Sequence, residues 1–168
     1  MIQSLNEINC LGCGALVPNT TGDVHAYIMA SPGCWQLYCD VQDWRNSFSD
    51  VHDVTAVQDL VDAYAAQHAT NPDRRNRQSV AVHLLSLCAS LEFSIPGTQR
   101  RRMIGHWTHR DYPMFEPMPE RFSVTVRNVT DATIEQREVV VAQMARSTWS
   151  AWSRHHEEIR SLLTNDFD

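Results

Sequence analysis

The feature that most constrains this fold is a Cys10-x-x-Cys13-Gly14 motif within the first 30 residues, which contain few helix-forming runs. Two thiolates three positions apart in a tight turn that contains glycine can bind one metal ion. Turn-forming residues follow in the run PNTTG, so this segment needs more than a hydrophobic core to fix it. We therefore predict a metal knuckle over residues 1–30.

Two further ligands are expected close to this motif. His25 lies in the same loop region, and Cys34 lies at the start of the next expected helix, where the helix dipole favours a thiolate. The spacing C-x2-C-x11-H-x8-C is local enough for one compact site, and ligation rich in thiolates favours zinc over magnesium or calcium. The fourth ligand stays open, because His68 or His83 could replace His25 if the knuckle folds onto the helices.

Two other interpretations of the cysteines remain. A redox pair would need a strand and helix flanking the motif, as in thioredoxin-like proteins, and the sequence does not indicate them. A disulfide would need export, which nothing in the sequence indicates. The last alternative is a set of unligated thiols.

The apolar spacing predicts three helices in residues 31–94. The first helix begins at Ser31-Pro32. The second runs from about Val54 to His68, and the third from about Arg74 to Glu92. The third is apolar on nearly every side, which is typical of a central helix.

The prolines of residues 95–130 predict an irregular connection with a short helical turn at about 99–104 and a short strand at 122–126. Residues 131–168 predict a long C-terminal helix with an apolar stripe. The expected fold over residues 1–168 is a mainly α, single-domain bundle of about four helices with an irregular, zinc-knuckle-like N-terminal segment.

A second polar cluster is expected where the second and third helices meet. A short connection makes these helices antiparallel, which brings His68 near Ser79 or His83. The cluster is either a structural hydrogen-bond network or a pocket for a small ligand. The catalytic candidates are Asp62, His68 and His83, and the pocket candidates are Tyr64, Gln67, Gln78, Ser79 and His156.

Composition excludes several classes of function. All 14 basic residues are Arg, so a phosphate-loop lysine and a Schiff-base lysine are excluded. The net charge of −6 argues against broad binding to nucleic acid, and the Arg runs at 74–77 and 100–102 are interpreted as solvated. The sequence indicates no membrane span and no secretory signal, and we expect a cytoplasmic protein.

Three strings carry a resemblance to a known family: CLGCGAL, HAYIMASPGCW, and DAYAAQH followed by QSVAVHLLSLC. They resemble an uncharacterised bacterial family, a domain of unknown function, with a CPxCGA-like knuckle and the strings SPxCW, DAYxxQHP and QSVxVHLxxLC. The sequence departs from that pattern at Leu11 and Ala69, where the family often has Pro. The resemblance implies shared polar positions but no reaction; they are Cys10, Cys13, His25, Cys34, Asp62, His68, Gln78 and His83.

These observations lead to one functional hypothesis and two alternatives. The leading hypothesis is a small zinc-binding helical protein with a small-ligand pocket around His68 and His83. One alternative is a metal-dependent hydrolase with an open zinc position, in which Asp62 or His68 acts as base toward a bound water. The other is a non-enzymatic module that binds a protein partner through an apolar loop at residues 112–115.

Overall fold

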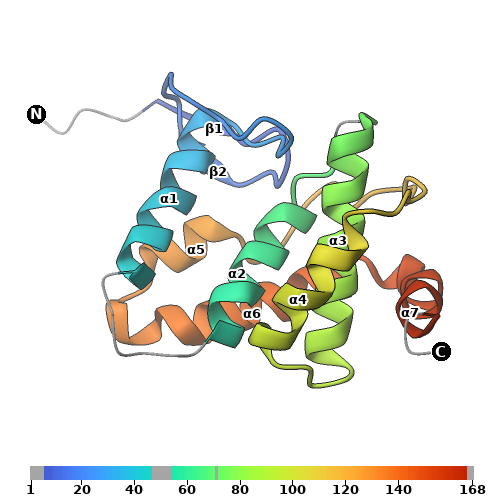
Figure 1. Ribbon diagram of the computed structural model, residues 1–168. Coiled ribbons are helices and arrows are strands. Elements are labelled where there is room, and N and C mark those ends of the chain that lie inside the picture. The colour runs from blue at the N-terminus through green and yellow to red at the C-terminus, as the bar shows by residue number, and fades with distance from the viewer. Residues whose placement is uncertain (1–5, 47–53, 71, 166–168) are drawn as a thin grey trace, which may run out of the picture.

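The computed structural model describes residues 6–46, 54–70 and 72–165, so the first five residues of the predicted knuckle segment lie outside it. The described chain is mainly α-helical, as predicted (Figure 1). Within it, seven α-helices replace the predicted four: α1 (Pro32–Asn46), α2 (Val54–Ala66), α3 (Arg74–Leu91), α4 (Gly97–Trp107), α5 (Val126–Asp131), α6 (Arg137–Ala151) and α7 (His156–Thr164). No helix within these ranges is long and apolar enough to cross a membrane.

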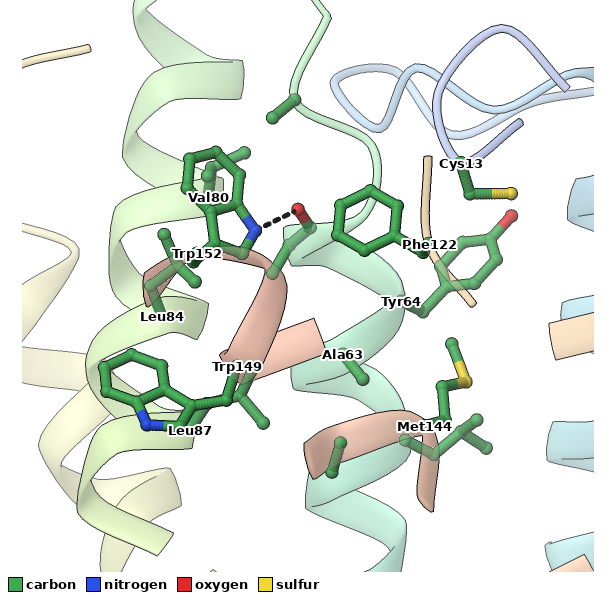
Figure 2. Packing of buried hydrophobic residues seen from close by; sticks show 14 of the residues in the cluster. Cys13, Ala63, Tyr64, Val80, Leu84, Leu87, Phe122, Met144, Trp149 and Trp152 are labelled. Carbon is green, nitrogen blue, oxygen red and sulfur yellow. Dashed lines mark hydrogen bonds between the residues drawn. The ribbon is translucent and has the colours of Figure 1, made fainter. Parts of the chain in front are cut away.

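Helix α2 lies at the centre of the bundle, where it packs against α3, α4 and α6 (Figure 1). Its inward face is rich in small residues such as Ala63, which lets the large side chains of neighbouring helices approach closely. Figure 2 shows Trp152 in this core, where its indole N–H donates a hydrogen bond of 3.2 Å to the carbonyl oxygen of Ala66. The C-terminal end of α2 is thereby tied to the end of α6.

A small β-hairpin precedes the helices and lies beside the start of α1 (Figure 1). Strands β1 (Glu7–Asn9) and β2 (Leu16–Pro18) are antiparallel, and the loop between them carries the CxxCG motif. Gly14 closes this loop with a φ of 74°, a left-handed conformation that glycine adopts without strain. At Gly33 a Cβ would lie 2.0 Å from the carbonyl oxygen of Pro18, so only glycine allows the hairpin to sit this close to α1.

The region predicted as an irregular connection differs most from expectation. Residues 95–130 contain α4 and α5, and no strand forms at 122–126, where residues 122–125 are irregular and α5 begins at Val126. The predicted long C-terminal helix is also broken, because a 3-10 turn at Ser153–His155 separates α6 from α7. Helix α7 consequently packs against α3.

Candidate metal centre

Three cysteines and one histidine gather at the junction of the hairpin, α1 and α2. Cys10 and Cys13 come from the hairpin loop, Cys34 from the first turn of α1, and His68 from the segment just after α2. Their four potential ligand atoms all lie within 4.8 Å of one another, and all four residues are buried. The structure therefore brings together a Cys3His group of the kind that binds metal ions in proteins.

The spacing of these atoms fits a tetrahedral zinc ion. Zn–S bonds of about 2.3 Å and Zn–N bonds of about 2.0–2.1 Å place sulfurs about 3.8 Å apart and sulfur and nitrogen about 3.5 Å apart around a tetrahedron. The Sγ atoms of Cys13 and Cys34 are 3.8 Å apart. The Nε2 atom of His68 is 3.5 Å from the Sγ atoms of both Cys10 and Cys34. All five cysteines are free thiols, and a separation of 3.8 Å is far from the roughly 2.05 Å of a disulfide.

The imidazole of His68 is held with its ligating nitrogen toward the thiols. Its Nδ1 lies 2.6 Å from the carbonyl oxygen of Tyr64, and a carbonyl can only accept, so Nδ1–H is the donor. This bond orients the ring so that Nε2 points toward the sulfurs of Cys10 and Cys34, where it could bind a metal ion after losing its proton. The ring is completely buried.

Backbone and glycine contacts fix the knuckle against this histidine. The Ser31 N–H donates to the Sγ of Cys10 at 3.4 Å, and the Leu11 N–H donates to the Ser31 hydroxyl at 3.1 Å. A Cβ at Gly12 would lie 2.2 Å from the Cδ2 of His68 and 2.6 Å from the carbonyl oxygen of Met29. The glycine inside the CxxC motif is therefore required for the loop to reach His68.

The electrostatics of the group favour a bound cation. Hydrogen bonds with Cys13 and Cys34 lower the pKa of the Cys10 thiol, whereas hydrogen bonds with Cys10 and Cys13, together with burial, raise the pKa of the Cys34 thiol. Burial lowers the pKa of His68, but hydrogen bonds and charge from Cys10 and Cys13 outweigh it and raise the pKa to about 9. Three thiolates cannot share this buried space without positive charge, which either protons or a metal ion can supply.

His25, the first choice for the fourth ligand, is not part of the group, and the open alternative His68 takes that place. The His25 ring instead packs at 4.3 Å against Tyr27 and at 5.3 Å against Trp35. Its Nδ1 is buried and has no hydrogen-bond partner among the described residues. Burial, and then the positive charge that His83 carries when it is protonated, lower the pKa of His25.

A second polar group lies between α2, α3 and α4, around the fully buried carboxylate of Asp62. Its Oδ1 accepts hydrogen bonds of 2.7 Å from both Gln58 Nε2 and His83 Nδ1. Its Oδ2 accepts from Ser86 Oγ at 2.5 Å and from Arg100 Nη1 at 2.8 Å. All the acceptor positions of the carboxylate are used.

Arg100 is the residue of this network that sequence reasoning missed. The sequence predicts a solvated run at 100–102, yet Arg100 is fully buried and pairs with both Asp62 and Asp59, the latter at 2.7 Å. Burial raises the pKa of Asp59, and the Arg100 guanidinium opposes this rise. The signal that could have found Arg100 is Asp62 on the apolar face of its helix, because a buried carboxylate requires a cationic partner.

The predicted pocket residues separate into different places. Tyr64 lies beside the Cys3His group, where its hydroxyl donates to Cys34 Sγ at 3.6 Å. Gln67 donates to the Val124 carbonyl oxygen at 2.8 Å in the core, and His156 stacks on Trp149 with ring centroids 3.8 Å apart. A surface pocket between α3 and α4 brings together the remaining candidates Gln78, Ser79 and His83.

The fold and the site define a mainly α-helical protein with a buried Cys3His group that could bind a metal. Comparison with protein families then gives a finer placement. The chain belongs to the family of unknown function DUF5946, whose model matches residues 8–153, and the resemblance seen in the sequence motifs is confirmed at that level. Comparisons with curated proteins and with solved structures each return no match.

Proposed function

We propose that this protein binds one zinc ion through Cys10, Cys13, Cys34 and His68, and that the ion is structural. The observation that carries the proposal is the agreement between the sulfur and nitrogen separations of 3.8 and 3.5 Å and those of a tetrahedral zinc site. A zinc ion there would fasten the hairpin to α1 and to the end of α2. Softer thiolate ligands favour zinc over magnesium and calcium.

Four protein ligands support a structural role over a hydrolytic one. A catalytic zinc site keeps one position open for water, whereas a Cys3His set fills a tetrahedral ion completely. The burial of all four residues points the same way, because a substrate would need access to the ion.

The interaction-module alternative has less support at the loop where we expected it. Tyr112 and Phe115 are buried rather than offered to a partner, and the Tyr112 side chain donates a hydrogen bond of 3.0 Å to the Trp107 carbonyl oxygen. An accessible pocket also exists beside His83, which a pure interaction module does not need.

Elemental analysis of the purified protein and paired variants tests the zinc site. We expect one zinc per chain in the wild type and strongly reduced zinc in Cys13→Ser and His68→Gln. Cys39→Ser and His25→Gln are the matched controls, because each removes the same residue type outside the group, and both should retain zinc. Zinc retained in His68→Gln but lost in His25→Gln would refute the ligand assignment, and no zinc in the wild type after reducing, chelator-free purification would refute the function.

Cobalt substitution gives a second readout, which reports the coordination of the ion and not only its presence. Tetrahedral cobalt bound to thiolates absorbs visible light strongly, so titration of the metal-free protein with Co²⁺ reports both geometry and sulfur ligation. We expect saturation at one equivalent. A weak, octahedral-type spectrum would contradict a closed Cys3His site.

A further inference from the structure

The pocket between α3 and α4 is separate from the metal centre and has a volume of about 290 Å³. This is close to the lower end of the range of roughly 300–1,000 Å³ for small-molecule sites. Arg75, Gln78, Ser79 and His83 of α3 are among the residues that line it. No Asp or Glu of the described chain lines the pocket, so the charge at its wall is positive.

His83 presents an oriented and unused ring nitrogen at this pocket. Its Nδ1 lies 2.7 Å from Asp62, and an ionised carboxylate can only accept, so Nδ1 carries the proton. In the neutral ring Nε2 is then an acceptor, and it has no hydrogen-bond partner among the described residues. Only 17% of the His83 side chain is exposed, while Asp62 behind it is fully buried and held by Arg100. The imidazole is therefore fixed in one tautomer and one orientation.

Ser79 supplies an independent sign of a ligand. It lies one helical turn before His83 on the same face of α3, and only 9% of it is exposed. Its Oγ is buried and has no hydrogen-bond partner among the described residues. A buried hydroxyl without a partner costs free energy, and a ligand that fills the pocket would remove that cost.

Arg75 adds the charge that a ligand would meet. It is one turn before Ser79 on the same helix face, and its side chain forms no ion pair with any described residue. The pocket wall beside it is secured by Gln78, whose amide group donates to the carbonyl oxygens of Thr108 and Arg110. A guanidinium binds carboxylate or phosphate through two parallel hydrogen bonds.

We propose that this pocket binds a small organic anion that also carries a hydroxyl group. Arg75 binds the carboxylate or phosphate group, Ser79 donates a hydrogen bond to it, and His83 Nε2 accepts from the hydroxyl. The inference goes beyond zinc binding and does not depend on it, since no ligand of the Cys3His group lines the pocket.

Three probes test this chemistry on the purified protein. Lactate and propionate differ by one hydroxyl group, and inorganic phosphate replaces the carboxylate. The readout is the resonance of His83 Nε2 in proton–nitrogen correlation spectra of histidine rings, in buffers of matched ionic strength. Small probes of this size should bind with a Kd on the order of 1–10 mM.

We expect saturable binding of lactate, and roughly 2–10-fold weaker binding of propionate, because propionate lacks the hydrogen bond to Nε2. Arg75→Ala should abolish binding of every anion and Ser79→Ala should weaken it. Arg74→Ala is the matched control, since Arg74 pairs at 2.8 Å with Asp111 and does not line the pocket. Stronger binding of phosphate than of lactate would identify the ligand class as a phosphate monoester. Stronger binding of lactate would identify it as a carboxylate.

Three results would overturn the proposal. The first is the absence of a saturable shift at His83 with any of the three probes. The second is an equal loss of affinity in Arg74→Ala and Arg75→Ala, which would indicate nonspecific attraction to positive charge. The third is equal affinity for lactate and propionate, which would contradict the role of His83 Nε2 as a hydroxyl acceptor. Zinc content measured on the same samples separates these outcomes from a failure of the metal centre.

Discussion

Replacing Asp62 with alanine should be among the most destabilising single changes in this protein. The carboxylate is fully buried and accepts four hydrogen bonds, one of them from the equally buried guanidinium of Arg100. Asp62→Ala leaves Arg100 with Asp59 as its remaining anionic partner, at 2.7 Å, and leaves His83 and Ser86 without their acceptor. Water cannot reach the buried guanidinium to replace the lost carboxylate, so hydration does not compensate for the lost ion pair.

Breaking one side of a buried ion pair costs about 3–5 kcal/mol. Against a total free energy of unfolding of roughly 5–15 kcal/mol for a domain, that is a large share of stability. For a chain of 168 residues, each kcal/mol corresponds to about 2–4 °C in Tm, so the expected fall is about 6–20 °C. Asp62→Asn keeps the shape and one acceptor oxygen, and its cost should fall between those of the wild type and Asp62→Ala.

Urea unfolding of the purified protein, followed by tryptophan fluorescence, measures this difference. The matched control is Asp131→Ala, which removes an aspartate from the half-exposed ion pair with Arg127 and should cost at most about 1 kcal/mol. The midpoint should shift for Asp62→Ala with an unchanged slope. If Asp62→Ala and Asp131→Ala were destabilised equally, the claim that this network stabilises the fold would be wrong.

Three further results are expected. Gly12→Ala should lower zinc content because the added Cβ meets His68 at 2.2 Å, whereas Gly105→Ala, with nothing within 4 Å, should leave zinc content unchanged and raise stability by about 0.4–1 kcal/mol. His25 has a lowered pKa from burial and the charge of His83, so the unfolded chain binds more protons there. Wild-type stability should therefore fall, relative to His25→Gln, as pH drops through about 6.5 toward the lower folded-state pKa, and histidine NMR titration should place that pKa below 6.5. Chelation, or acidification that protonates the thiols, should release zinc and lower Tm, with recovery on adding Zn²⁺ at neutral pH; a Tm insensitive to zinc would contradict a structural ion.

The local part of the fold was predictable because its signals are local. Pro32 begins α1 as expected, and the periodic apolar residues of α2 and α3 place both helices within two residues of their ends. Cys10, Cys13 and Cys34 follow from spacing alone, since turns and helix starts bring such residues together without distant contacts.

The sequence predicts only a short helical turn at 99–104 where the structure has the longer helix α4, because a buried side chain in the middle of that helix is polar. At a position where a periodic pattern would have an apolar residue, α4 has Arg100. The guanidinium of Arg100 is buried and forms ion pairs with Asp59 and Asp62 of α2. The break between α6 and α7 also has no local signal, because the apolar stripe continues through Trp152 with helical spacing. The break occurs where the Trp152 indole binds the end of α2, a contact that only the packed structure defines.

The fourth member of the cysteine cluster shows the same limit in a single residue. His25 is nearer to the cysteines in sequence, but its ring packs against Tyr27 and Trp35 and is not directed toward the cysteines. His68 lies 34 residues beyond Cys34, yet the end of α2 carries it there and the Tyr64 carbonyl oxygen orients its ring. Proximity in the sequence therefore predicts the three cysteines of the hairpin loop and the start of α1, but it does not predict the histidine. Which histidine completes the group depends on the backbone acceptor that orients its imidazole. At this site that acceptor is the carbonyl oxygen of Tyr64 on α2, one turn before His68.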